Sequence, residues 1–274
     1  MKSKISSIRS KTIRDFGNQF QRYNDIKNDN YWSGLEHITD LLGDTFNLDE
    51  INGKYICEVG SGSGRIVHIL SKLKPKLIFS IEPSKAIDVQ KINNKSISNI
   101  EYHNISGSEF KLSKQCDYIF SLGVIHHIKK PDDVIKNIYD NLNKDGVFIC
   151  SVYAKEKNKF LIFLLFILGF TSKISDNLLD KFSMLLNIIL SFYILLCKIV
   201  PLNLPMKKYL INRFIKNTFK NRTQIIFDQL NPAYAKFYTK SEIKYLLENN
   251  GFQIIKIFDS AENNWGVRAK KLNN

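Results

Sequence analysis

Three glycines at alternate positions, Gly60, Gly62 and Gly64, follow directly on an apolar segment at residues 55–59 and constrain the fold more than any other feature. Glycine lets the backbone turn sharply and come close to a ligand. A helix can begin immediately after these glycines, so that its N-terminal amides face whatever the loop holds. In open α/β sheets, ligands bind at such turns, at the carboxyl ends of the strands. The segment therefore predicts a strand–loop–helix unit that binds an adenosine-type ligand.

Two acidic residues frame this loop. Glu82 lies 22 residues after Gly60, at the end of the next apolar segment, and an acid at this distance suits the hydroxyls of a ribose. Glu58 stands just before the loop, where a carboxylate repels phosphate groups and attracts a cationic ligand. The glycine spacing also differs from the G-x-G-x-x-G pattern of dinucleotide sites. Together these features favour a positively charged cofactor over a dinucleotide.

The E-x-G-x-G-x-G run from Glu58 to Gly64 resembles motif I of the class I S-adenosylmethionine-dependent methyltransferases, and residues 116–127 resemble the fourth motif of that family. The resemblance covers about 50–154 and 232–270 and is nearest to the small-molecule, type 11-like branch. It implies S-adenosylmethionine (SAM) as cofactor and methyl transfer as the reaction. It also implies cofactor contacts at the following residues: Glu58, Gly60, Ser61, Gly62, Gly64, Glu82, Pro83, Ser84, Ser106, Gly107, Leu122, Gly123 and Tyr23.

The order of the predicted elements indicates a doubly wound α/β fold. Strands and helices alternate through the first half of the chain, and a capping box at Thr239 begins a last helix that two strands follow. The expected architecture is a three-layer α/β/α Rossmann-like sheet, mostly parallel, with the last strand antiparallel. Its strands are expected at 55–59, 77–81, 100–103, within 116–127, and at 147–153, 252–258 and 265–269.

The 274 residues suit one large α/β domain with an insertion. We expect an N-terminal helical lead-in at 1–48 and a SAM-binding methyltransferase domain formed by 49–154 and 232–274. A hydrophobic helical cap insertion is expected at 155–231. This division separates cofactor binding from the part of the chain that would cover the site.

The position after the third strand departs from the family pattern. Methyltransferases of this family commonly have an aspartate there that accepts a hydrogen bond from the adenine amino group, whereas this chain has Ser106, followed by Gly107. A serine hydroxyl or a backbone carbonyl can make the same contact. We therefore expect the adenine to bind near Ser106.

The lead-in carries an apolar stripe with helical spacing, which predicts a helix with one buried face. In related methyltransferases an N-terminal helix folds over the cofactor, so Phe16, Gln19 and Tyr23 are expected to line the site. Aromatic rings near a sulfonium add cation–π attraction. The alternative, that the stripe only packs against the sheet, stays open.

The insertion contains two strongly apolar segments, residues 160–170 and 182–200. The first is too short to cross the hydrocarbon layer of a membrane, about 30 Å thick, and the second is nearly long enough. Two crossings would be needed to return the chain to the same sheet, so no transmembrane span is expected. Two interpretations stay open: a helical cap that roofs the site, or a cap that contacts a membrane surface through 160–222.

Composition bounds the partners. The net charge is +14, but no block of Lys and Arg interleaved with aromatic residues is present, which predicts no nucleic-acid partner and favours a small-molecule or lipid-linked acceptor. The four cysteines lie inside apolar segments without metal-ligand spacing, so no metal and a reducing compartment are expected. The expected localisation is cytoplasmic, or peripheral at the inner face of the membrane.

Three residues are candidates for catalysis. An oxygen or carbon nucleophile must lose a proton during methyl transfer, and a histidine titrating near pH 7 is a natural base. His127 lies at the end of the fourth strand, and Tyr153 and Tyr234 are expected near the acceptor. The acceptor atom (oxygen, nitrogen or carbon) stays open. So does a non-catalytic, cofactor-binding or scaffold role on the same fold.

Overall fold

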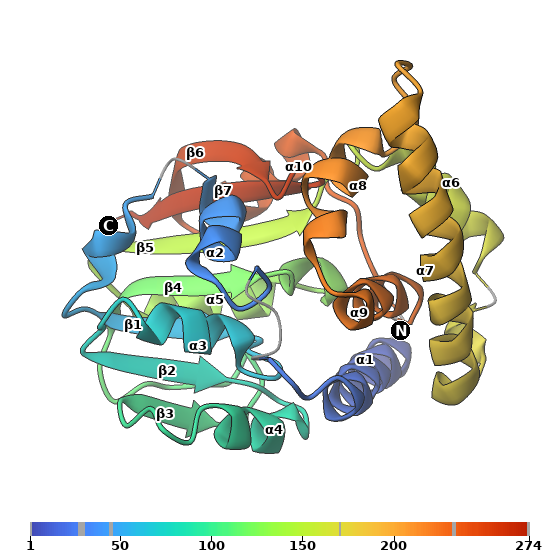
Figure 1. Cartoon of the computed structure of the whole chain (residues 1–274). Helices are drawn as coiled ribbons and strands as arrows, with labels where there is room; N and C mark the ends of the chain where they lie inside the picture. Colours follow the sequence, from blue (N-terminus) through green and yellow to red (C-terminus); the bar gives the residue numbers. More distant parts are fainter. Residues whose placement is uncertain (1, 27–30, 44–45, 170, 232–233, 273–274) are drawn as a thin grey trace.

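The computed structural model describes residues 2–26, 31–43, 46–169, 171–231 and 234–272 (Figure 1). Within these residues a seven-stranded sheet forms in the order β3-β2-β1-β4-β5-β7-β6. Strand β7 pairs antiparallel with both of its neighbours, and the other pairs are parallel. The strands are β1 (Tyr55–Val59), β2 (Leu77–Ile81), β3 (Ile100–His103), β4 (Cys116–Leu122), β5 (Leu142–Tyr153), β6 (Phe252–Ser260) and β7 (Asn264–Lys271).

Helices cover both faces of the sheet. One face packs against α2 and α3, and the other against α5 and α10. Helices α1 and α6 to α9 gather where the strands β1, β2, β4 and β5 end, on the right of Figure 1, and α4 lies below β2. The helices are α1 (Lys2–Arg22), α2 (Leu35–Leu42), α3 (Arg65–Ser71), α4 (Ala86–Asn93), α5 (Asp132–Asn141), α6 (Lys159–Ile167), α7 (Asp176–Ile199), α8 (Lys207–Asn212), α9 (Phe219–Leu230) and α10 (Lys240–Glu248).

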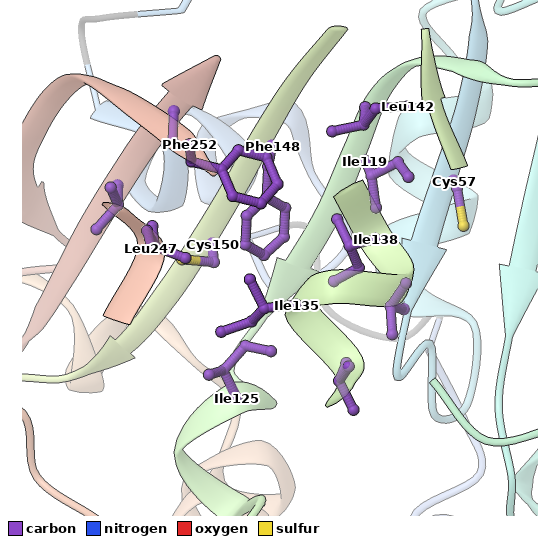
Figure 2. Close-up of a cluster of buried hydrophobic side chains, with 14 of the residues drawn as sticks. Cys57, Ile119, Ile125, Ile135, Ile138, Leu142, Phe148, Cys150, Leu247 and Phe252 are labelled. Carbon is purple, nitrogen blue, oxygen red and sulfur yellow. The ribbon is translucent and has the colours of Figure 1, made fainter. Parts of the chain in front are cut away.

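Successive residues of the central strands supply the two cores, because side chains alternate across a sheet. On β4, Ile119 joins the cluster under α5 and α10, whereas Phe120 joins the cluster under α2 and α3. Phe148 and Ile149 of β5 divide in the same way. Figure 2 shows the first cluster, in which Phe148 lies beside Phe252 with ring centroids 5.6 Å apart. The sheet is therefore buried on both faces, as a three-layer fold requires.

The structure confirms the predicted fold class, and the differences lie at element boundaries. Strand β5 begins at Leu142 rather than at 147, because Leu142 pairs with Cys116 across an irregular register. The predicted capping box is present: the Thr239 hydroxyl accepts from Glu242 N, and the Glu242 carboxylate accepts from Thr239 N at 2.8 Å. All four cysteines are buried as free thiols.

Helices α6 to α9 lie in the segment that was expected to form the insertion. Part of this segment packs with Tyr23, the residue after α1, into a third apolar cluster, which contains Leu179 of α7 and Phe227 of α9. Arg213 forms an ion pair with Asp40 of α2, which connects the segment to the sheet domain. The proposed domain boundaries themselves stay a prediction.

Candidate active site

The loop after β1 takes a shape that only glycine adopts freely. Gly60, Gly62 and Gly64 all have positive φ angles, of 82°, 53° and 81°. A Cβ atom on Gly60 would lie 2.6 Å from Val124, and one on Gly62 would lie 2.8 Å from the ring of Phe20. The first two glycines are thus needed at the cavity wall, both for conformation and for space.

Glu82 locks this loop to the end of β2. Its Oε2 accepts a hydrogen bond from Gly62 N and its Oε1 accepts from Ser84 N, both at 2.9 Å. The carboxylate is 6% exposed and still lines the cavity described below. Each carboxylate oxygen has a further lone pair, so Glu82 can accept from a ligand hydroxyl without giving up the loop.

Glu58 is a buried acid whose oxygen lacks a partner. It is 2% exposed, and its Oε2 has no hydrogen-bond partner among the described residues. Burial raises the pKa of Glu58 to about 8, and the nearby Glu82 adds to the rise while Arg65 opposes it. Glu58 lines the same cavity as Glu82. An unsatisfied buried carboxyl of this kind favours a cationic or hydrogen-donating ligand group.

One cavity of about 400 Å³ joins these residues. The glycine loop forms one wall, and α1 forms another through Phe16, Gln19 and Phe20. The predicted contacts that line it are Glu58, Gly60, Ser61, Gly62, Glu82, Pro83, Ser106, Gly107, Leu122 and Gly123. The residues present thus fit SAM: acids are available for a sugar and an ammonium group, and Gly60 and Gly62 bring the loop backbone to the cavity without a side chain.

His127 lines the cavity on the side away from Glu82's strand, in a short 3₁₀ helix after β4. Its Nδ1 lies 3.0 Å from the carbonyl oxygen of Tyr234. A carbonyl can only accept, so Nδ1 carries the hydrogen and Nε2 keeps its lone pair. Burial lowers the pKa of His127, which the charge of Asp228 partly opposes. The imidazole is therefore neutral near pH 7 and competent to take a proton.

Asp228 of α9 completes this end of the cavity. Gln19 Nε2 donates to Asp228 Oδ1 at 2.9 Å, and the hydroxyl of Tyr153 also donates to this carboxylate. Burial raises the pKa of Asp228, and the neighbouring His127 opposes the rise. Helices α1 and α9, distant in sequence, thus bring Gln19 and Asp228 to the same histidine.

Five predicted residues lie outside the cavity lining: three predicted cofactor contacts and two predicted catalytic tyrosines. Gly64 begins α3, where a Cβ would lie 2.4 Å from Gln90 and Asn94, so it serves helix packing. The Ser84 hydroxyl accepts from Ala86 N at 3.1 Å, just before α4. The Tyr23 hydroxyl binds Asp180, and its ring packs on Phe227.

Tyr153 and Tyr234 contact residues of the site without lining the cavity. The Tyr153 ring stacks on His126, with centroids 3.8 Å apart, and its hydroxyl accepts from Gln229 at 2.8 Å. Tyr234 contributes its carbonyl to His127, not its phenol. Both residues therefore position the histidine and the aspartate rather than line the cavity.

Sequence reasoning missed several polar residues of the cavity. Arg9 of α1 binds Ser106 and Ser108 and forms an ion pair with Glu109 at 3.2 Å. Arg65 lies over the ring of Trp32, 4.1 Å from its centroid, and both line the cavity. Lys129 and Lys130, both exposed, also line it. No local pattern signals these residues, because the fold collects them from separate segments.

Comparison with known families gives one match over most of the chain. A family model described as a methyltransferase domain matches residues 31–257. Two solved structures have the same fold at low identity. The N-methyltransferase NodS of Bradyrhizobium japonicum, bound to S-adenosylhomocysteine (SAH), has a TM-score of 0.54 at 10% identity, with 94% of this chain and all of that chain covered. A SAM-dependent methyltransferase of Aquifex aeolicus has a TM-score of 0.52 at 12% identity, with 93% and 98% covered.

Curated relatives match over a shorter stretch. A tRNA U34 carboxymethyltransferase of Campylobacter curvus is 29% identical over 145 residues, which is 52% of this chain and 47% of that protein. One of Sulfurimonas denitrificans is 30% identical over 120 residues, 42% of this chain and 39% of that protein. The chain thus spans less than half the length of these relatives in the matched region. SAM is the cofactor of this fold and family, as predicted.

These relatives overturn one expectation from the sequence. The exclusion of a nucleic-acid partner is wrong, since the relatives are named for tRNA. The exclusion depended on the absence of a continuous basic block, but cations need not be adjacent in sequence. Arg9, Arg65, Lys129 and Lys130 come from three segments and meet around one cavity.

The raised pKa of Glu58 predicts a pH-dependent stability. Between about pH 5 and pH 8 the folded chain, without cofactor, holds a proton that the unfolded chain releases, so its free energy of unfolding falls as pH rises. Glu58→Gln is neutral throughout and lacks this loss. We expect the melting temperature of the wild type to fall by several degrees relative to Glu58→Gln over this range, measured by differential scanning fluorimetry. Parallel pH profiles for the two proteins would contradict a buried, protonated Glu58.

Proposed function

We propose, from the premise that this chain belongs to the methyltransferase-domain family and uses SAM, that it methylates an unpaired base of RNA. The observation that carries the proposal is the single cavity in which the glycine loop and Glu82 face His127. The cofactor half of the cavity, with the glycine loop and Glu82, thus adjoins a proton-accepting half with His127. Methyl transfer to a nucleophile that must lose a proton requires both groups at one site.

The cofactor half is assigned to two acids. Glu82 would accept from the ribose hydroxyls, since it is anchored by Gly62 and Ser84 and faces the cavity. Glu58 would accept from the ammonium group of the methionine end, which supplies the partner that its Oε2 lacks. A cation beside Glu58 also lowers the pKa that burial has raised, so the bound state favours the ionised carboxylate.

His127 is assigned as the base. When bound, SAM would supply a methyl group on a positively charged sulfur. The acceptor atom would attack the methyl carbon in line with the carbon–sulfur bond, which breaks and leaves SAH. His127 Nε2 would take the acceptor's proton as the new bond to the methyl carbon forms. The Tyr234 carbonyl fixes the tautomer through Nδ1, and Asp228 stabilises the resulting imidazolium. Gln19 and Tyr153 hold Asp228 in place.

Three features support an RNA acceptor. Relatives that match part of the chain are tRNA U34 carboxymethyltransferases. Lys129 and Lys130 lie exposed beside His127, where they would attract phosphates. Phe16 and Trp32 line the cavity and supply aromatic side chains against which an unpaired base can pack. The acceptor expected from the sequence, a small or lipid-linked molecule, lacks comparable support.

Replacing Glu82 tests the cofactor half. Glu82→Gln keeps the shape but loses the charge and one acceptor, so charge-assisted hydrogen bonds worth about 1.5–3 kcal/mol are weakened. We expect the affinity for SAH, measured by isothermal titration calorimetry, to fall at least tenfold. Glu248→Gln, an exposed acid on α10, is the matched control and leaves the affinity unchanged. Equal affinities for both variants would remove Glu82 from the cofactor site.

Replacing His127 tests the base. A general base contributes about 10²–10⁴-fold, so His127→Gln should lower kcat by this factor while SAH affinity is retained. Tyr234→Phe removes only a phenol and keeps the carbonyl, so its kcat stays close to wild type. Because the pKa of His127 is lowered, wild-type kcat falls only at pH values below about 6.5. A His127→Gln enzyme with wild-type kcat would exclude this role.

The acceptor is tested with SAM labelled in the methyl group and total cellular RNA. We expect label in RNA that ribonuclease releases. The double substitution Lys129→Gln/Lys130→Gln should weaken methyl transfer to RNA. It should also reduce the slope of log RNA affinity against log salt concentration by about 1.4, because each phosphate contact contributes about 0.7 on single strands. SAH affinity should not change. Label confined to a small-molecule or lipid extract, with cofactor binding intact, would disprove the RNA acceptor.

A further inference from the structure

Helix α7 buries two polar side chains in its middle and exposes many large apolar side chains on its other side. Ser183 and Asn187 are fully buried, and Asn187 Nδ2 donates to Phe219 O and Thr223 Oγ1 of α9, both at 2.9 Å. On the opposite side Phe192 and Ile199 are 71% and 72% exposed. A surface helix of a protein surrounded by water has the reverse arrangement. The outward side of α7 is therefore built for an apolar environment.

Helix α6 extends this apolar surface. It has the sequence KFLIFLLFI, yet it contains no buried residue, and Phe166 is 85% exposed. Leu165 of α6 packs on the same cluster as Leu179 and Ile194 of α7. Both helices lie at the edge of the molecule away from the sheet (Figure 1). Such a concentration of exposed apolar side chains marks an interaction surface.

We define the α6–α7 face by the large apolar side chains that are exposed between residues 160 and 202. It holds fourteen of the twenty exposed large apolar side chains found in the described part of the chain. They are Phe160, Phe163, Phe166, Ile167, Leu178, Met184, Leu185, Ile188, Ile189, Phe192, Leu195, Leu196, Ile199 and Leu202.

The charges around the α6–α7 face are positive. Exposed lysines stand among or beside its residues: Lys159, Lys173, Lys181, Lys198 and Lys208. No salt bridge joins any of these five to an acid in the parts of the chain that the structure describes. Asp180, the nearest acid of α7 to Lys181, is bound by Tyr23 and Arg22. This pattern complements anionic lipid headgroups, whereas a second copy of the face would bring like charges together.

We propose that the α6–α7 face inserts into the interface of an anionic lipid bilayer, with α7 lying in the membrane plane. Helix α7 has 24 residues and contains an 18-residue window with a mean hydropathy of 2.0, so by length and composition it could cross a bilayer. Its inner side, however, is bonded to α9, which carries Arg222 and the cavity residue Asp228. A crossing would carry these groups into hydrocarbon, whereas an in-plane position immerses only the outward side.

This proposal is independent of the acceptor and is tested by flotation of the full chain with vesicles. We expect the protein to float with vesicles of phosphatidylcholine and phosphatidylglycerol, and much less with phosphatidylcholine alone. Phe166→Ser/Phe192→Ser should lower the partition coefficient at least tenfold. Ile92→Ser on α4, which is 70% exposed, is the matched control and should not change it. Unchanged SAH affinity shows that each variant is folded.

Two results would overturn the proposal. In one, the wild type fails to float with anionic vesicles, or Phe166→Ser/Phe192→Ser floats as well as the wild type. In the other, analytical ultracentrifugation shows a dimer that the double substitution dissociates while the vesicles bind no protein, which would assign the face to a second copy of the chain.

Discussion

The hydrogen bond from Gly62 N to Glu82 Oε2, 2.9 Å long, holds the cofactor end of the site in shape. It can form because parallel pairing of β1 with β2 brings the ends of the two strands to the same edge, with Val59 opposite Ile81. Behind it lies a buried polar network in which Ser80 Oγ donates to Ser61 Oγ at 2.7 Å. Because every polar group in this network is buried, the loop has few alternative conformations. The loop in turn places the start of α3 at Arg65, while pairing with β2 and β4 places Glu58.

The local parts of the fold and of the site were predictable from the sequence. The glycine loop, Glu82 and the capping box at Thr239 are encoded within a few residues, and the structure has all of them. Long-range partners were not predictable. Arg9 reaches Ser106 across 97 positions, and the carbonyl of Tyr234 sets the tautomer of His127. Such contacts depend on how α1 and the segment after α9 pack, which no periodicity reveals.

The orientation of α7 shows the same limit. Ser183, Asn187 and Ser191 recur every four residues and form one polar stripe. A stripe of this kind normally faces water. Here it faces α9, because Asn187 satisfies the Phe219 carbonyl and the Thr223 hydroxyl there. The sequence therefore identifies the two faces of the helix, but only the tertiary structure shows which one is buried.

Different parts of the chain build the two ends of the cavity. The sheet and its loops supply Glu58 and Glu82, whereas Gln19 of α1 and Asp228 of α9 stand at the end beside His127. Tyr23, the residue after α1, packs its ring on Phe227 of α9 in the third cluster, with ring centroids 5.7 Å apart. The Gly62–Glu82 bond is made within the sheet and its loops, so substitutions in α9 can reshape the end of the cavity beside His127 without disturbing that bond.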